Sequence, residues 1–280
     1  MIELKNKYKK KIRLGFMQGR LVDSEKRGRI QYFPDKNWTK EISATISGGQ
    51  SNTAWSSGTV SGGTMNTAAG IYGTVSGGNS NLATGSFSSV LGGKLNTATV
   101  NYTAILGGLS NKTEGDYSSV IGGKSNTAAG TYNIVAGGSF NETSGSHSVI
   151  GGGEQNIASG DHSMVAGGGD NEASAQYVSV SGGQFNTASG DYSSLGGGFR
   201  NVVSGSYSII SGGQNNQVDG DNSNIAGGED NQSSGNYATI AGGQSNLAIA
   251  NYSNVAGGLN NQALGLYSSV SGGRNNTAAG

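Results

Sequence analysis

The chain has 280 residues, with no cysteine, one proline, 52 glycines and 17 acidic against 17 basic side chains. The lack of cysteine excludes a disulfide scaffold and a thiolate metal site, and so much glycine without proline or a Gly-x-y period excludes a collagen. No apolar run reaches the roughly 18–20 residues of a membrane-spanning helix, and no apolar segment typical of a secretory signal follows the basic N-terminus.

Charge divides the chain into two predicted domains. Residues 1–42 carry twelve Lys/Arg against five Asp/Glu, whereas residues 43–280 carry five against twelve. We therefore expect a basic, non-repeat segment over 1–42 and a glycine-rich repeat domain over 43–280. The basic run from Lys5 to Arg13 is the one feature that favours nucleic-acid binding. We interpret it as a solvated tail and expect no nucleic-acid partner.

Part of the basic segment carries a family resemblance. Ile12-Arg-Leu-Gly-Phe-Met-Gln-Gly-Arg-Leu21, followed by Gly28-Arg-Ile-Gln-Tyr-Phe-Pro34 and Trp38, resembles the start of sugar phosphate isomerase/epimerase barrels. There a first strand leads through a loop into helix 1, so residues 12–41 imply a strand–loop–helix remnant. Such a barrel needs roughly 250 residues, with site groups from several strand ends. We therefore assign no catalytic residue and expect no enzyme; a non-functional isomerase fragment fused to repeats is one alternative.

The rest of the chain repeats one pattern sixteen times: an aliphatic residue, any residue, Gly-Gly, two residues and Asn. The Gly-Gly pairs start at Gly48 and Gly62 and then recur every fifteenth residue to Gly272. So strict a short period predicts a solenoid in which each repeat forms one coil. The chain stops in mid-coil at Gly280, from which we expect a repeat domain truncated at its C-terminus.

Each repeat contains two short runs of alternating residues. In one copy Ser118 and Val120 share a face, and so do Asn126 and Ala128, with Gly-Gly between the two runs. Alternation of this kind indicates strands, and Gly and Asn favour turns. We predict an all-β fold: a parallel β-roll or β-solenoid of sixteen coils of about 15 residues, each adding about 4.8 Å.

Stacked coils place equivalent residues in columns. We expect these columns to act as structural ladders through packing and hydrogen bonding, not as binding sites. The predicted ladders are an aliphatic column (Val75, Val90, Val120 and Val135), an Asn column (Asn81, Asn96, Asn111 and Asn126) and an aromatic column (Tyr102, Tyr117 and Tyr132).

A further column lies directly before Gly-Gly and is small or apolar in every copy. Burying one valine contributes about 1.5–3 kcal/mol, whereas ordering fifteen residues costs about 15–30 kcal/mol. Because a single coil is so thinly filled, an outward column kept free of charge indicates a packing surface. The candidate oligomer face contains Leu91, Leu106, Ile121 and Ala136.

The repeats also resemble a known family. Ser118-Ser-Val-Ile-Gly-Gly-Lys-Ser-Asn-Thr-Ala-Ala-Gly130 and its equivalents over 43–280 are similar to the head repeats of trimeric autotransporter adhesins. The resemblance implies a left-handed roll and a homotrimer on the bacterial surface that binds host matrix, glycan or other cell surfaces. No neck, heptad stalk or membrane strand is found, so we expect no membrane contact by this segment. A structural spacer of a phage or bacterial fibre is the alternative.

Other chemical readings are weaker. His147 and His162 fall on adjacent coils of the aromatic column. They could bind a metal ion together, or each imidazole could simply replace a tyrosine ring in the column. We expect the replacement, and no metal or cofactor. Asp161, Asp191 and Asp221 are too scattered for the calcium-binding repeat of β-roll toxins. Ice binding would need a regular array of threonines. The outward position after Asn is threonine in only six of the sixteen coils, so we do not expect ice binding (Thr53, Thr67, Thr97, Thr127, Thr187 and Thr277).

Overall fold

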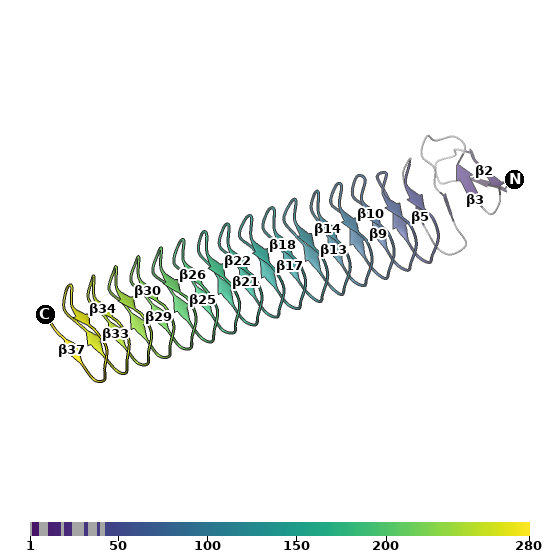
Figure 1. Cartoon of the computed structure of the whole chain (residues 1–280). Coiled ribbons are helices and arrows are strands. Elements are labelled where there is room, and N and C mark those ends of the chain that lie inside the picture. The colour runs from purple at the N-terminus through teal and green to yellow at the C-terminus, as the bar shows by residue number, and fades with distance from the viewer. Residues whose placement is uncertain (1, 6–10, 18–19, 24–30, 33–37, 40–42) are drawn as a thin grey trace. The chain divides into compact units, whose positions relative to one another are not determined.

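A computed structural model describes residues 2–5, 11–17, 20–23, 31–32, 38–39 and 43–280. These residues form strands and turns and no helix. The predicted fold class is confirmed: the chain is an all-β parallel β-solenoid of about sixteen coils (Figure 1). It comprises two units, Met1–Tyr132 and Asn133–Gly280.

The described part of the basic segment is strand. β1 (Ile2–Lys5), β2 (Lys11–Met17) and β3 (Arg20–Asp23) form an antiparallel sheet. β2 covers the strand expected at the start of the isomerase resemblance. Much of the expected loop and helix (18–19, 24–30, 33–37 and 40–41), and residues 6–10 of the basic run, lie outside the described residues.

The solenoid's pairing extends back to residue 38. β4 (Gln31–Tyr32) pairs antiparallel with β5 (Trp38–Thr39), and β5 pairs parallel with β7 (Thr53–Ala54). Trp38 lies opposite Thr53, which keeps the fifteen-residue offset of the repeats. The parallel ladder therefore begins ahead of the first Gly-Gly pair.

In the first unit each coil contributes a two-residue strand to each of two parallel sheets. The aliphatic sheet contains β6 (Thr45–Ile46), β8 (Thr59–Val60), β10 (Thr74–Val75), β12 (Ser89–Val90), β14 (Ala104–Ile105) and β16 (Ser119–Val120). The alanine sheet continues from β5 and β7 through β9 (Thr67–Ala68), β11 (Leu82–Ala83), β13 (Thr97–Ala98), β15 (Lys112–Thr113) and β17 (Thr127–Ala128).

The second unit repeats this arrangement. Its aliphatic sheet contains β18 (Ile134–Val135), β20 (Val149–Ile150), β22 (Met164–Val165), β24 (Ser179–Val180), β26 (Ser194–Leu195), β28 (Ile209–Ile210), β30 (Asn224–Ile225), β32 (Thr239–Ile240), β34 (Asn254–Val255) and β36 (Ser269–Val270). Its alanine sheet contains β19 (Glu142–Thr143), β21 (Ile157–Ala158), β23 (Glu172–Ala173), β25 (Thr187–Ala188), β27 (Val202–Val203), β29 (Gln217–Val218), β31 (Gln232–Ser233), β33 (Leu247–Ala248), β35 (Gln262–Ala263) and β37 (Thr277–Ala278).

One repeat has fourteen residues instead of fifteen, and the missing residue is lost from a turn. Thr45 pairs with Thr59, fourteen residues on, whereas Val75 pairs with Val90, fifteen residues on. In the short coil the turn passes through Ser56 and Ser57, both with positive φ. A turn of this kind lies outside the sheets, so a residue is lost there without shifting the pairing register.

The strands are shorter than the alternating runs of the sequence suggest, since each contains two residues. Within one coil Gly123, Ser125 and Tyr132 all have positive φ, and equivalent residues recur in other coils. A left-handed residue bends the chain away from the extended form, so only two residues remain extended in each strand. For a residue with a Cβ this conformation costs about 1–2 kcal/mol. Here the stacking of neighbouring coils must supply that energy.

The core of each coil is formed by four inward side chains. Ser118, Val120, Asn126 and Ala128 are all buried, whereas Ser119 between them is partly exposed. This is the inward and outward alternation that the sequence predicts. One aliphatic side chain per coil makes a thin core, in which polar groups occupy half of the inward positions.

Several buried polar side chains in the described coils lack a hydrogen-bond partner, and Thr143 is one of them. The Thr143 hydroxyl replaces alanine in the inward column of the alanine sheet and forms no hydrogen bond. An unsatisfied buried hydroxyl costs about 1–3 kcal/mol, and valine already occupies this column at Val203 and Val218. We therefore expect Thr143→Val to stabilise the fold by about 1 kcal/mol in urea denaturation. The outward Thr187→Val is the control, with a change below about 0.5 kcal/mol; equal effects would contradict the assignment.

Candidate functional site

The Asn column is the main hydrogen-bond ladder of the turns. Asn96 is fully buried, and its Nδ2 donates to the carbonyl oxygens of Gly92 (2.9 Å) and Gly108 (3.0 Å). Its Oδ1 accepts the backbone N–H of Asn111 at 3.0 Å, and its own N–H donates to Oδ1 of Asn81 at 3.0 Å. The same pattern includes Asn126, whose N–H donates to Oδ1 of Asn111. Both side-chain amide hydrogens are used, so this column offers nothing to a ligand.

The aliphatic column is likewise enclosed. Val75, Val90, Val120 and Val135 have no exposed surface. Within the first unit Val75 pairs with Val90 across the sheet. These side chains support the coils and are not available at the surface.

The aromatic column lies on the surface, at the turn that leads into the aliphatic sheet. Tyr102, Tyr117 and Tyr132 are about half exposed, and all three have positive φ. Successive ring centroids are 4.8 Å apart, with ring planes 1° and 10° from parallel. Partial desolvation raises the pKa of the Tyr117 phenol above its ordinary value, and the neighbouring Tyr102, Tyr132 and Asp116 raise it further.

In the second unit two histidines continue the same kind of stack. The rings of His147 and His162 are 4.8 Å apart and 8° from parallel, and His162 stacks on Tyr177 at 4.7 Å. Face-to-face rings of this kind fit a ring-for-ring replacement in the column. No group of three or more His, Cys, Asp or Glu that could hold a metal ion gathers anywhere in the described part of the chain.

The stack is interrupted at Asn222, which is not among the site residues predicted from the sequence. Rings stack from His147 to Tyr207 and again from Tyr237 to Tyr267. Asn222 occupies the aromatic position in the coil between them, with the same left-handed φ of 56°. The sequence signal was present, since a single asparagine in a column of rings marks a missing ring.

The candidate oligomer face lies outward on the aliphatic sheet. Leu91, Leu106 and Ile121 are each nearly half exposed, and Ala136 in the second unit is partly exposed. A second outward column, two residues earlier, is also uncharged in every coil, for example at Ser89, Ala104 and Ser119. We call these two columns together the charge-free face.

The outward face of the alanine sheet differs, because it carries charged residues (Lys112, Glu114, Glu142, Glu172 and Asp219). Lys112 Nζ lies 3.6 Å from Glu114 Oε1. The two outward faces of the solenoid are therefore chemically unlike, and only one of them is free of charge.

One carboxylate on the alanine sheet is held by its neighbours. Gln217 Nε2 donates to both oxygens of Asp219 at 2.8 and 2.9 Å, and Ser204 Oγ donates to Oδ1 at 2.8 Å. Partial burial acts to raise the pKa of Asp219, but hydrogen bonds from Gln217, Ser204, Gln232 and Ser234 outweigh it and lower that pKa. The carboxylate is satisfied within the chain, which indicates a structural role.

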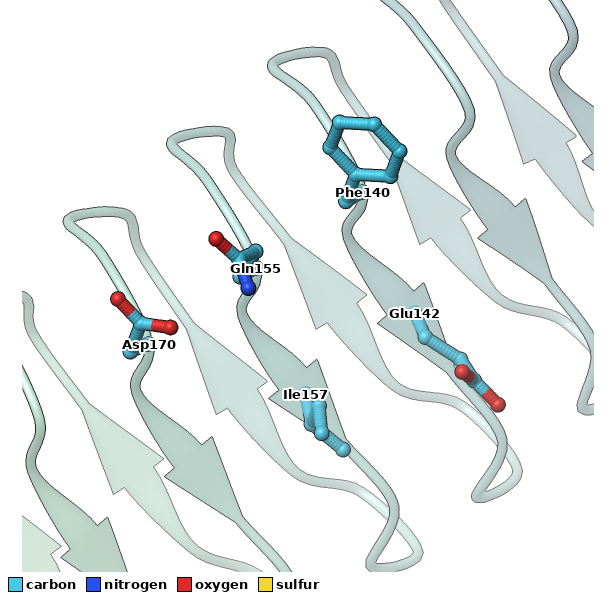
Figure 2. Close-up of a pocket in the computed structure, with 5 residues that line it drawn as sticks. All are labelled: Phe140, Glu142, Gln155, Ile157 and Asp170. Carbon is cyan, nitrogen blue, oxygen red and sulfur yellow. The ribbon is translucent and has the colours of Figure 1, made fainter.

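An open hollow of about 490 Å³ lies on the same side of the second unit. Figure 2 shows its five lining side chains, which come from three successive coils. They are Phe140, Glu142, Gln155, Ile157 and Asp170. The two carboxylates are separated by apolar and amide groups and do not converge on one point. The hollow therefore has the form of an open surface depression.

Comparison with protein-family models and curated proteins assigns the chain to no family. No protein-family model matches the chain, and no curated protein matches it. Among the described residues no helix is long and apolar enough to span a membrane.

Proposed function

We propose that this protein is a structural interaction module: a β-solenoid whose copies associate side by side through the charge-free face. In this proposal the assembled solenoid is the head of a surface-displayed fibre. It adheres to an extracellular protein, a glycan or another cell surface, and it is not an enzyme.

The observation that carries the proposal is the contrast between the two outward faces. Leu91, Leu106 and Ile121 expose nearly half of their apolar side chains in consecutive coils, with small uncharged residues beside them. Charged residues are depleted from the centres of protein interfaces because burying an unpaired charge is costly. A face that excludes charge in every coil, beside a face that does not, fits lateral association of copies.

The number of copies comes from the resemblance alone. Repeats like Ser118–Gly130 imply three parallel chains with left-handed coils and display on a bacterial surface. Lateral association also supplies what a single coil lacks, because one buried aliphatic residue per coil offsets only a small part of the ordering entropy. We therefore propose a homotrimer.

Sedimentation equilibrium of the full chain tests the association. We expect the mass of a trimer at micromolar concentration, and we expect Leu106→Lys to weaken association at least about tenfold, because it places an unpaired charge in the interface. Thr67→Lys is the matched control: it adds the same charge on the alanine sheet and should leave the mass unchanged. A monomer at all concentrations, or equal effects of the two lysines, would refute the proposal.

Binding assays then distinguish adhesion from a spacer role. An associated solenoid that binds immobilised matrix proteins or glycans supports the fibre head. An associated solenoid that binds none of them favours a structural spacer of a phage or bacterial fibre.

A further inference from the structure

The break in the aromatic column leaves two ring faces uncovered. Asn222 lies in the turn between β29 (Gln217–Val218) and β30 (Asn224–Ile225), and the flanking coils place Tyr207 and Tyr237 at the equivalent positions. Tyr207 stacks on Tyr192 and Tyr237 stacks on Tyr252, each pair 4.9 Å apart and 2° from parallel. On the side towards Asn222 neither tyrosine has a ring partner in the described coils.

The gap has the width of one ring. Each coil adds about 4.8 Å, so Tyr207 and Tyr237 lie about 10 Å apart. One planar ring placed midway would stack on both tyrosines at the spacing that the column already uses. Aromatic pairs at this separation are favourable beyond the area they bury.

Exposure agrees with an uncovered face. Tyr207 is 59 % exposed, whereas Tyr177 and Tyr192, which have rings on both sides, are 47 % and 48 % exposed. Tyr237 is 52 % exposed, close to the 46 % of Tyr252 and the 50 % of Tyr102, which also have rings on both sides. By its exposure Tyr207 therefore resembles the end of a stack.

The backbone hydrogen bonds between coils continue without interruption at the gap. The N–H of Asn222 donates to the Ser206 carbonyl oxygen at 2.8 Å, and the N–H of Tyr237 donates to the Asp221 carbonyl oxygen at 2.9 Å. The coils on either side therefore keep their spacing. The exposed Asn222 side-chain amide forms no hydrogen bond within the described part of the chain, so its donors and acceptor are available at the base of the gap.

The surroundings favour a cation. Asp221 Oδ1 accepts the Ser206 N–H at 2.8 Å, and the Asp221 N–H donates to Asn236 Oδ1 at 3.0 Å, which fixes this acidic residue beside the gap. From residue 201 to residue 273 the sequence has four acidic residues and no lysine or arginine. A positive ring would gain from the carboxylate of Asp221 and from the faces of the two tyrosines.

We propose that Tyr207, Asn222 and Tyr237 form a slot that binds one planar aromatic cation between the two tyrosine rings. The slot is independent of the proposed fibre function, because it uses the turn and not the charge-free face. Asn222 supplies hydrogen bonds at the base of the slot, and Asp221 supplies the charge preference.

Titration with proflavine, a planar acridine cation, followed by fluorescence tests the slot. We expect one proflavine per chain, and binding of anthracene-2-sulfonate, a planar anion, at least about tenfold weaker. Asn222→Tyr fills the gap with a ring and should weaken proflavine binding at least about tenfold. Its melting temperature should be equal or higher, since the new ring stacks on both neighbours.

A second variant moves the slot. Tyr192→Asn in the Asn222→Tyr background opens the same kind of gap between Tyr177 and Tyr207, beside Asp191, which accepts the Gln176 N–H as Asp221 accepts that of Ser206. We expect one proflavine site to return. Binding by Asn222→Tyr equal to that of the parent chain, or no return of the site in the double variant while it remains folded by circular dichroism, would overturn the proposal.

Discussion

Gly108→Ala is expected to destabilise the solenoid by about 4 kcal/mol or more, which is exceptional for the addition of one methyl group. Gly108 has a φ of 93°, and an added Cβ would lie 2.2 Å from the Gly123 carbonyl oxygen and 2.5 Å from Asn111 Nδ2. The first contact belongs to the next coil and the second to the Asn ladder. The methyl group can be accommodated only if adjacent coils separate. Urea denaturation followed by circular dichroism measures the loss.

The adjacent glycine provides the control. A Cβ added to Gly107 meets no atom within 4 Å, and Gly107 does not have positive φ. Gly107→Ala should therefore change the free energy of unfolding by less than about 1 kcal/mol, because its main effect is on the entropy of the unfolded chain. Similar losses for the two variants would show that the coils are not held as closely as the structure indicates.

Asn96→Asp is expected to destabilise the fold by about 3–5 kcal/mol at neutral pH, the usual result of an uncompensated buried charge. The substitution keeps the size of the side chain and the oxygen that accepts from the Asn111 N–H. It replaces the amide that donates to the carbonyl oxygens of Gly92 and Gly108 with an acceptor oxygen. Three oxygens then face one another without a proton in a position that has no exposed surface.

The effect should depend on pH in one direction. Burial beside two carbonyl oxygens raises the pKa of the new carboxyl in the folded state above its unfolded value of about 3.9. Stability relative to the parent chain is therefore lost as the pH rises above the unfolded value, and it is partly regained in acid, where the protonated carboxyl can donate one hydrogen bond. Urea midpoints of both proteins across pH 4 to 8, roughly the window between these states, measure the difference.

Asn251→Asp is the matched control for this substitution. Asn251 Oδ1 accepts the Asn236 N–H at 3.0 Å, and Asp221 makes the equivalent contact with Ser206 at 2.8 Å. Because aspartate already serves in this exposed column, the control should change stability by less than about 0.5 kcal/mol. The assigned role of the Asn ladder would be contradicted if Asn96→Asp lost no more stability than Asn251→Asp, or if its loss of stability grew towards acid pH.

The repeat period by itself determined the fold class and which residues align. A constant offset of fifteen residues fixes the parallel pairing, as Val75 with Val90 shows, and alternation separates inward Val120 from outward Ser119. These follow because stacked coils bring equivalent positions together, and because residues alternate between the two sides of a strand. The sequence predicts the column of the charge-free face that contains Leu106 for the same reason.

The tertiary structure decided how the chain turns and what the turns present. Tyrosine has no local preference for positive φ, so the left-handed conformation of Tyr102 and Tyr117 arises only when neighbouring coils hold the turn. That conformation puts the rings on the surface, where they stack on one another. The slot at Asn222 follows from the same geometry. The proposed binding at this slot depends on the tyrosine rings fifteen residues before and after Asn222. Sequence spacing alone does not show which way those rings face.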